Sequence, residues 1–147
     1  MWVGVNFGAR MTVLKRLRNE SSMSVILRAR ELAVYTMQVC GNEKRFPKRY
    51  RWCITAKVVE EAKEILRKLT FANSMRVDVP EEGQQRRMMQ AKAMAHSFCL
   101  LTEINIAFDF LGLPEREVRH WTGLVMEVQR LLKAWQKSDA ARQGAKH

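Results

Sequence analysis

The feature that most restricts how this chain can fold is an apolar repeat in its last third. Apolar side chains recur there at intervals of 3, 4, 3, 4 and 3 residues, at Val118, Trp121, Val125, Val128, Leu132 and Trp135. In an α-helix this spacing puts all six side chains on one stripe, as in helices that pack lengthwise against partners. We therefore expect a helix over about 114–137 whose stripe lies in a core.

Three more segments have helical spacing, at about 24–40, 47–73 and 81–111. Their boundaries carry helix-stopping residues, and Gly41–Asn42 predicts the end of the first helix, where Gly41 is able to take the left-handed conformation. The apolar stripes of the first two are Val25, Ala29, Leu32, Thr36 and Val39, and Val58, Ala62, Ile65, Leu69 and Ala72. With only three prolines and seven glycines in 147 residues, the sequence predicts an all-α, antiparallel up-down four-helix bundle.

The third of these segments is apolar on more than one face. Its body reads MMQAKAMAHSFCLLTEINIAFDFL. A bundle core covers only one stripe of a helix, so this width predicts contact with two surfaces, the chain's own bundle and another subunit.

Around the bundle, expected at 23–138, we predict a flexible basic arm at 1–22 and a disordered tail at 139–147. The cysteines, Cys40, Cys53 and Cys99, are odd in number and lie in apolar helical contexts, which favours buried free thiols in a reducing cytoplasm. No uninterrupted apolar run reaches the about 18 residues of a membrane span, and no membrane role is expected.

The charge of the chain is concentrated near its N-terminal third. Of the net +11, residues 1–52 carry +8, with 11 Lys and Arg against three Glu. A field of this sign attracts polyanions.

Its densest part is KRFPKRYRW, residues 44–52, where a helix is expected to begin. Helix N-termini favour acids, and the third and fourth segments open with Glu81–Glu82 and Glu115–Glu117, so five cations at the start of the second need another explanation. A bound polyanion supplies one, because free N–H groups and basic side chains both bind phosphate, and Tyr50 and Trp52 can stack on unpaired bases if exposed. The alternative is that Phe46 and Trp52 pack at the edge of the core and the cations only solvate a loop.

Arg86 and Arg87 either extend this basic surface or are simply solvated. The predicted nucleic-acid-binding residues are Lys44, Arg45, Lys48, Arg49, Tyr50, Arg51, Arg86 and Arg87.

The sequence contains only weak signals for a metal site or a catalytic site. His96 and Cys99 have a spacing that can share a metal, but no second pair accompanies them, and a buried polar pair is favoured. Glu103, Asn105 and Asp109 interrupt an apolar helix without a nucleophile or paired motif, which favours a pore-lining or interhelical role. We expect no catalytic residues, no cofactor and no metal, and hence no enzyme.

The order of these elements resembles that of a known family. Phe46–Lys48 (FPK) opens a long second helix, Phe71–Asn73 (FAN) closes it, Leu111–Leu113 (LGL) forms a later turn, and Trp135 is followed by Lys137. Over about residues 22–138 the chain resembles the accessory variability determinant (Avd) family of diversity-generating retroelements. It is also similar in architecture to a bundle family encoded within bacterial ribosomal-RNA genes.

The Avd resemblance implies four-helix protomers assembled as a homo-pentamer with a basic surface. It implies a cytoplasmic, non-enzymatic accessory subunit that binds a reverse transcriptase and its RNA, or an RNA–DNA hybrid, during error-prone cDNA synthesis. The positions carried over are Phe46, Pro47, Lys48, Asn73 and Trp135. The sequence departs from the family at Lys133 and Ala134, where small residues are frequent. The alternative function is a protein–protein adaptor with no nucleic-acid role.

Overall fold

The structure, a computed structural model, describes residues 20–144, and this part of the chain is a four-helix bundle without strands. The long helices are α2 (Glu20–Cys40), α3 (Ala56–Ser74), α4 (Pro80–Leu111) and α5 (Glu115–Gly144). Two short turns, η1 (Lys48–Tyr50) and η2 (Arg51–Thr55), precede α3. The predicted all-α class is therefore confirmed.

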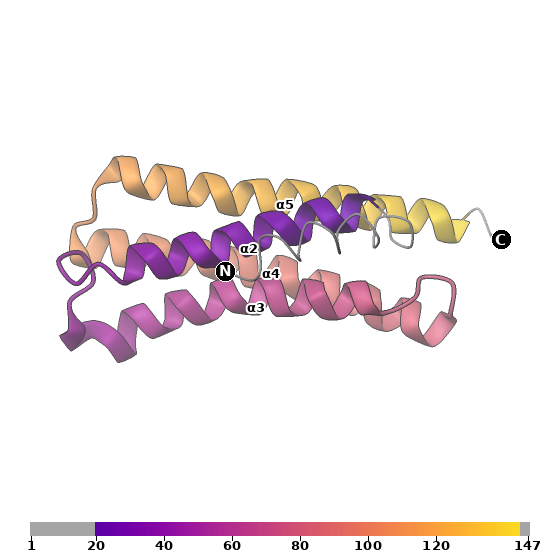
Figure 1. Cartoon of the computed structure of the whole chain (residues 1–147), viewed down its shortest axis with the longest axis horizontal. Coiled ribbons are helices and arrows are strands. Elements are labelled where there is room, and N and C mark those ends of the chain that lie inside the picture. The colour runs from indigo at the N-terminus through magenta and orange to yellow at the C-terminus, as the bar shows by residue number, and fades with distance from the viewer. Residues whose placement is uncertain (1–19, 145–147) are drawn as a thin grey trace, which may run out of the picture.

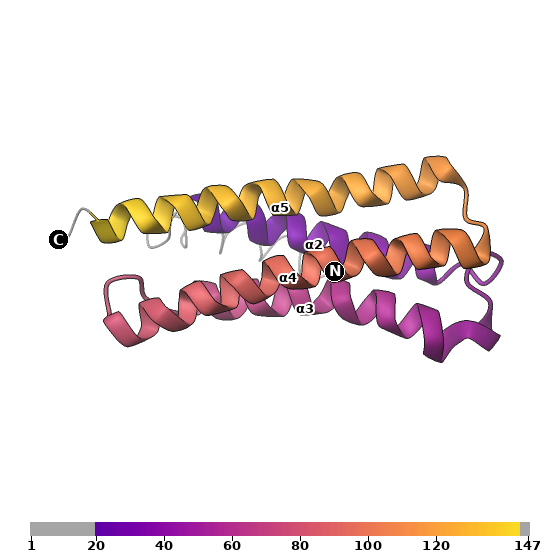
Figure 2. The same cartoon turned by 180° about the vertical axis from the view of Figure 1, so that it is seen from behind.

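The four helices lie side by side along their length (Figure 1). α3 packs against α2 and α4, and α5 packs against the same two helices. The α2–α3 and α4–α5 connections lie at one end of the bundle and the α3–α4 connection lies at the other, as the reverse view also shows (Figure 2).

The core is built from the stripes that the sequence predicts. All six residues of the α5 repeat are buried, as are all five of the α3 stripe. In α2 the first four predicted positions are buried, and Val39 is half-buried. Trp121 joins two helices, because its indole N–H donates to Thr36 Oγ1 at 2.9 Å. The periodicity of three and four residues thus identified the core correctly.

The start of α4 follows the expected chemistry. Pro80 occupies the first turn of α4, where its missing N–H costs nothing, and Glu81 and Glu82 lie in the same turn. α2 ends at Cys40, where Gly41–Asn42 predicts a stop, but Gly41 is not left-handed. Among the described residues only Gly112 has a positive φ, of 68°, at the C-terminus of α4. The left-handed stop therefore lies in the α4–α5 connection.

The prediction of a disordered tail from residue 139 is wrong for 139–144, because α5 continues to Gly144. Asp139 is 3% exposed and is paired with Arg86, 6% exposed. Packing against α4 therefore stabilises a segment whose composition alone predicts disorder. Residues 145–147 lie outside the described part of the chain.

The predicted basic arm, 1–22, falls mostly outside the described residues. Its last part belongs to α2, which begins at Glu20, and Ser22 is already buried. The bundle therefore begins earlier than residue 23.

The outer face of α4 is apolar and exposed. Met88, Phe98, Ile106 and Phe110 are all exposed, although they lie on one long helix whose opposite side is buried in the core. By length and mean hydropathy (1.2 over 18 residues) α4 is the one helix among the described residues that could cross a membrane, a test that core helices of soluble proteins also pass. Only 22% of that window is buried within the protomer.

Candidate nucleic-acid interface

A hydrogen-bonded turn presents the predicted basic segment. The N–H groups of Arg45 and Phe46 donate to the carbonyl oxygen of Asn42 at 3.0 and 2.8 Å. The side-chain oxygen of Asn42 also accepts from the N–H of Lys44 at 3.0 Å, an arrangement that asparagine favours in turns. The backbone of this segment is therefore ordered by its own contacts.

The helix that follows begins irregularly. Pro47 is extended, with φ −60° and ψ 145°, and a 3-10 turn (η1) and a π-helical turn (η2) follow before regular α-helix starts at Ala56. Ile54 is the only buried residue of these two turns. Short π segments are frequent at functional sites, because they change the direction of side chains locally.

Acidic residues are absent from this helix start. The first turns of η1, η2 and α3 contain none, whereas α4 opens with Glu81 and Glu82 and α5 with Glu115 and Glu117. A helix N-terminus carries partial positive charge, so cations here oppose the dipole. Helix stability does not explain their presence.

The five cations of this segment are exposed, and we call them the basic cluster: Lys44, Arg45, Lys48, Arg49 and Arg51. Arg45 lies 3.7 Å from a carboxylate oxygen of Glu117, and Lys48 lies 3.7 Å from one of Glu43. Ion pairs of this length at the surface contribute little.

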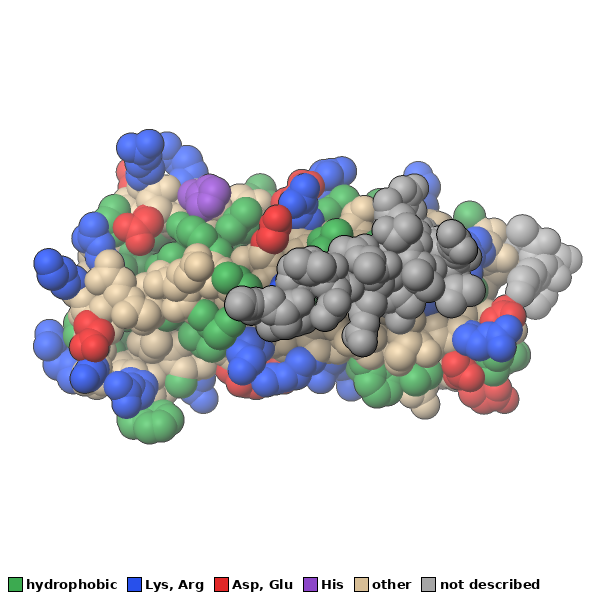
Figure 3. Space-filling view, in the orientation of Figure 1, with side chains coloured by type: hydrophobic (Ala, Val, Ile, Leu, Met, Phe, Trp, Pro, Cys, Tyr) green, Lys and Arg blue, Asp and Glu red, His purple; other side chains and the backbone are tan. Residues whose placement is uncertain are grey.

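The other three members of the basic cluster have no carboxylate partner within the described chain. Figure 3 shows blue Lys and Arg side chains gathered at the left end of the molecule, where the α2–α3 connection lies. This end of the bundle therefore carries cationic groups that an external anion can approach.

Two aromatic residues of the segment are used within the protein. Phe46 is buried and meets the Trp121 ring edge-to-face, with centroids 6.1 Å apart. Tyr50 is half-buried, meets Phe110 edge-to-face at 5.0 Å, and has the guanidinium of Arg49 above its ring at 4.8 Å. The core-edge alternative is thus correct for Phe46.

Trp52 is different, because its side chain is 79% exposed. The core-edge alternative is wrong for this residue, and the predicted binding set did not include it. The interleaving of aromatics and cations pointed to it, but the sequence could not tell an inward ring from an outward one.

Arg86 does not belong to a nucleic-acid surface, and the prediction for it is wrong. Its Nε and Nη2 donate to Asp139 at 2.6 and 2.9 Å, and its Nη1 donates to the carbonyl oxygen of Met75 at 2.8 Å. Its guanidinium also lies over the Trp135 ring, 4.9 Å from the centroid. Three of the five N–H donors of this guanidinium are engaged and the side chain is buried, so a phosphate outside the bundle does not reach it.

Arg87 is exposed, but it follows the α3–α4 connection, at the opposite end of the bundle from the basic cluster (Figure 1). The structure therefore does not bring the two predicted groups of cations together.

The remaining polar candidates lie on α4 and differ in exposure. His96 Nδ1 lies 2.6 Å from Glu61 Oε1, between α4 and α3, while Cys99 is exposed, so the predicted buried pair of His96 with Cys99 is wrong. Within this part of the chain no three His, Cys, Asp or Glu side chains converge on a metal position.

Asn105 and Asp109 are exposed and Glu103 is half-buried, on the outward half of α4. Of the thiols, Cys40 is buried as predicted, but Cys53 is exposed like Cys99. Burial raises the pKa of the Cys40 thiol to about 12.

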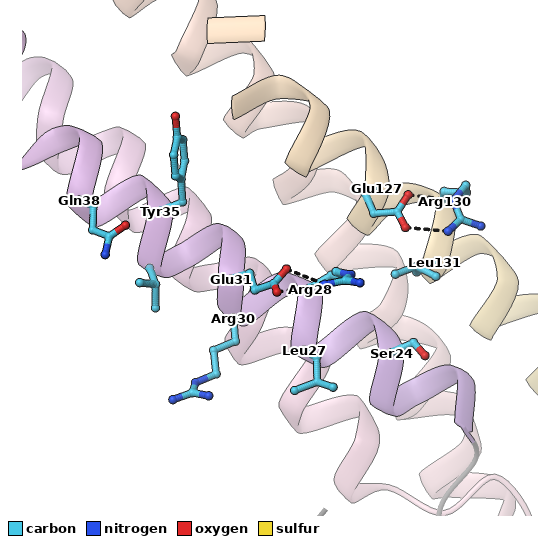
Figure 4. A pocket seen from close by; sticks show the side chains of 11 residues that line it. Ser24, Leu27, Arg28, Arg30, Glu31, Tyr35, Gln38, Glu127, Arg130 and Leu131 are labelled. Carbon is cyan, nitrogen blue, oxygen red and sulfur yellow. Dashed lines mark hydrogen bonds and ion pairs between the residues drawn. The ribbon is translucent and has the colours of Figure 1, made fainter. Parts of the chain in front are cut away.

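Two surface pockets of the described chain have room for a ligand. The larger, about 600 Å³, lies between α2 and α5 (Figure 4), and its Arg28–Glu31 and Arg130–Glu127 pairs already satisfy one another across short distances. A smaller one of about 170 Å³ lies beside the basic cluster and is lined in part by Phe46. Neither concentrates unpaired charge in an enclosed space, so the exposed basic cluster is the better candidate site.

No known family model, curated protein or solved structure matches this chain.

Proposed function

We propose that this protein is a non-enzymatic, nucleic-acid-binding accessory subunit. The observation that carries the proposal is the basic cluster, five exposed cations at a helix start without acids, which opposes the helix dipole and is placed to meet an external polyanion. The net charge of +11 adds long-range attraction for the same ligand.

The identity of the partners rests on the sequence resemblance to the Avd family. On that basis the ligand is a template RNA or an RNA–DNA hybrid, and the protein partner is a reverse transcriptase performing error-prone cDNA synthesis in the cytoplasm. The antiparallel up-down order of the bundle, which the same family implies, is supported by connections that alternate between the two ends (Figures 1 and 2). A reverse-transcriptase gene beside a short variable repeat in the same genome would support this assignment, and co-purification of the two proteins would test it.

Binding is tested with two variants of equal charge change. Lys44, Arg49 and Arg51 have no carboxylate partner within the described chain, and replacing all three by Gln should weaken RNA binding. The control replaces Lys92, Lys133 and Lys137, which are exposed elsewhere on α4 and α5.

The salt dependence separates specific contact from general attraction. Each phosphate neutralised on a single strand adds about 0.7 to the slope of log affinity against log salt, so the cluster variant should lose about 2 from that slope. The control should keep the slope of the unmodified protein. Equal behaviour of the two variants would mean that the basic cluster makes no direct contact.

Self-association is part of the proposal, and we expect a closed homo-pentamer. The exposed apolar face of α4 supports it, because four large apolar side chains of one helix remain exposed in the protomer. Light scattering at moderate salt should give about five times the 17.2 kDa of one chain. Ile106→Glu on this face should dissociate the assembly, and Met126→Glu, an equally exposed apolar position on α5, should not. A monodisperse monomer of the unmodified protein would exclude the pentamer.

The same face also favours a second function, a bundle adaptor that binds only protein. RNA in the purified protein, seen as a 260/280 nm absorbance ratio above that of protein alone, distinguishes the two. Protein free of RNA, with no affinity for added RNA, would favour the adaptor.

A further inference from the structure

Trp52 is the most exposed large apolar side chain of the described residues, at 79%. Tryptophan is usually well buried in folded proteins. The position of this ring follows from the local helix start. Ile54, two residues later in the same turn, points into the core, and side chains two residues apart on a helical turn point in nearly opposite directions. The fold therefore holds the indole out in solvent.

Tyr50, which the sequence names together with Trp52 for base stacking, is poorly available for it. Its ring has the Arg49 guanidinium over a face at 4.8 Å and the Phe110 ring against it at 5.0 Å. A base would have to displace one of these contacts. Trp52 has no ring or guanidinium partner within the described chain, so its indole faces are open.

Cations adjoin the indole in the sequence. Arg51 precedes it directly, and Lys48 and Arg49 lie four and three residues before it, within the two short turns η1 and η2. All three are exposed. A flat apolar ring beside several cations matches the chemistry of one unpaired base with the phosphates on either side of it.

We propose that Trp52 is a stacking platform that makes this end of the bundle selective for single-stranded nucleic acid. The inference rests on the proposed function, since it specifies which nucleic acid the basic cluster receives. Cations alone bind any phosphate backbone and favour the denser charge of a duplex. In a duplex the base faces are covered by their neighbours, so an indole on a convex turn reaches a base only where the strand is unpaired.

The surroundings of Trp52 favour this ligand over a lipid surface or a protein. A tryptophan that anchors a protein interface is normally ringed by contacts that exclude water. A helix that lies on a membrane presents a continuous apolar face. Here the sequence neighbours of Trp52 are Arg51 and Cys53, both exposed.

The test compares one single strand with one duplex by fluorescence anisotropy, using the full-length protein. The probes are labelled oligouridine of about 16 nucleotides, near the upper end of common single-strand site sizes, and an RNA duplex of the same length. Trp52→Leu keeps apolar volume without a π face, and Trp52→Phe keeps a smaller ring. Because the side chain is exposed, both variants should unfold at the temperature of the unmodified protein.

Trp52→Leu should weaken oligouridine binding by about 5- to 150-fold, the equivalent of about 1–3 kcal/mol for one stacked base. Duplex affinity should change by less than about twofold, and the salt slope should stay the same because no charge is removed. Trp52→Phe should retain most of the single-strand affinity. On binding oligouridine, the unmodified protein should lose indole fluorescence that the Leu variant does not lose.

Three results would overturn the inference in distinguishable ways. If Trp52→Leu binds oligouridine as well as the unmodified protein does, while the basic-cluster variant binds poorly, the stacking role fails and the proposed function stands. If the unmodified protein binds neither probe, both fail. If only anionic vesicles bind and shift the indole emission to the blue, Trp52 is a membrane contact instead.

Discussion

Replacing Asp139 by asparagine is expected to destabilise the bundle by about 3–5 kcal/mol. Both carboxylate oxygens of Asp139 are engaged by Arg86, at 2.6 and 2.9 Å, and one of them also accepts from Gln90 Nε2 at 2.9 Å. Both members of the ion pair are more than nine-tenths buried. Asparagine has nearly the same shape but no charge, so the guanidinium stays buried without a counter-ion, which is the costly case.

Urea unfolding followed by circular dichroism at one fixed protein concentration measures this loss. At a slope of about 2 kcal/mol per molar, the midpoint should fall by about 2 M. The matched control is Glu127→Gln. It removes an exposed carboxylate that accepts hydrogen bonds from two nitrogens of Arg130, Nε at 2.9 Å and Nη2 at 2.6 Å. Its midpoint should not move measurably, because water replaces the lost partner.

A double variant separates the charge from the packing. Arg86→Met with Asp139→Leu removes both charges and should recover most of the stability lost by Asp139→Asn, since no unpaired ion remains in the core. The reasoning is refuted if Asp139→Asn behaves like the exposed control. That result would mean that the end of α5 does not pack against α4 and that the chain is disordered from residue 139.

Two further predictions concern the core. Trp121→Ala should cost about 3–5 kcal/mol because the ring is 1% exposed, whereas Trp52→Ala should leave the urea midpoint unchanged, and equal effects would contradict the burial of Trp121. In the folded protein a maleimide should label Cys53 quickly and Cys40 only after unfolding, as resolved by mass spectrometry. The pKa of the buried Cys40 thiol is raised to about 12, so the unfolded chain releases this proton at lower pH than the folded chain does, and stability should fall as pH rises from about 9 to 12. Labelling of Cys40 and Cys53 at one rate would contradict the burial of Cys40.

The helices were accessible from the sequence because their signal is local and repeated. In the α5 repeat and the α3 stripe, every helical turn contains an apolar residue on the side that faces the core. Each of these predicted residues is buried in the structure. The start of α4 was equally readable, since Pro80 and Glu81–Glu82 each have a preferred place in a first turn. The helix stop at Gly41 was also predictable, but the left-handed conformation was not, because Gly41 and Gly112 both follow a long helix and only the path of the chain selects between them.

The sequence predicted where the positive charge of the candidate site lies, but it did not predict which way the aromatic side chains point. Five cations within nine residues were predicted to lie at a helix start, and all five are exposed there. Whether each aromatic residue between them faces inward depends on a π-helical turn, which no spacing rule for regular helices anticipates. The sequence therefore named both Tyr50 and Trp52 for stacking and placed only Tyr50 in the binding set, whereas Trp52 is the exposed ring.

What the sequence by itself determined is the all-α class, the helices, their core stripes and the position of the positive charge. These follow from residue type and from spacing within a few turns, which act before any distant contact forms. Only the tertiary structure decided the fate of Arg86, because its partner lies 53 residues away at Asp139. From its polar sequence neighbours alone, the Arg86 guanidinium is predicted to be exposed. In the structure it is enclosed by the distant Asp139 carboxylate and the Trp135 ring. The same contact decided that α5 continues through residues whose composition predicts disorder, since burial of an ion pair depends on which segments meet in space.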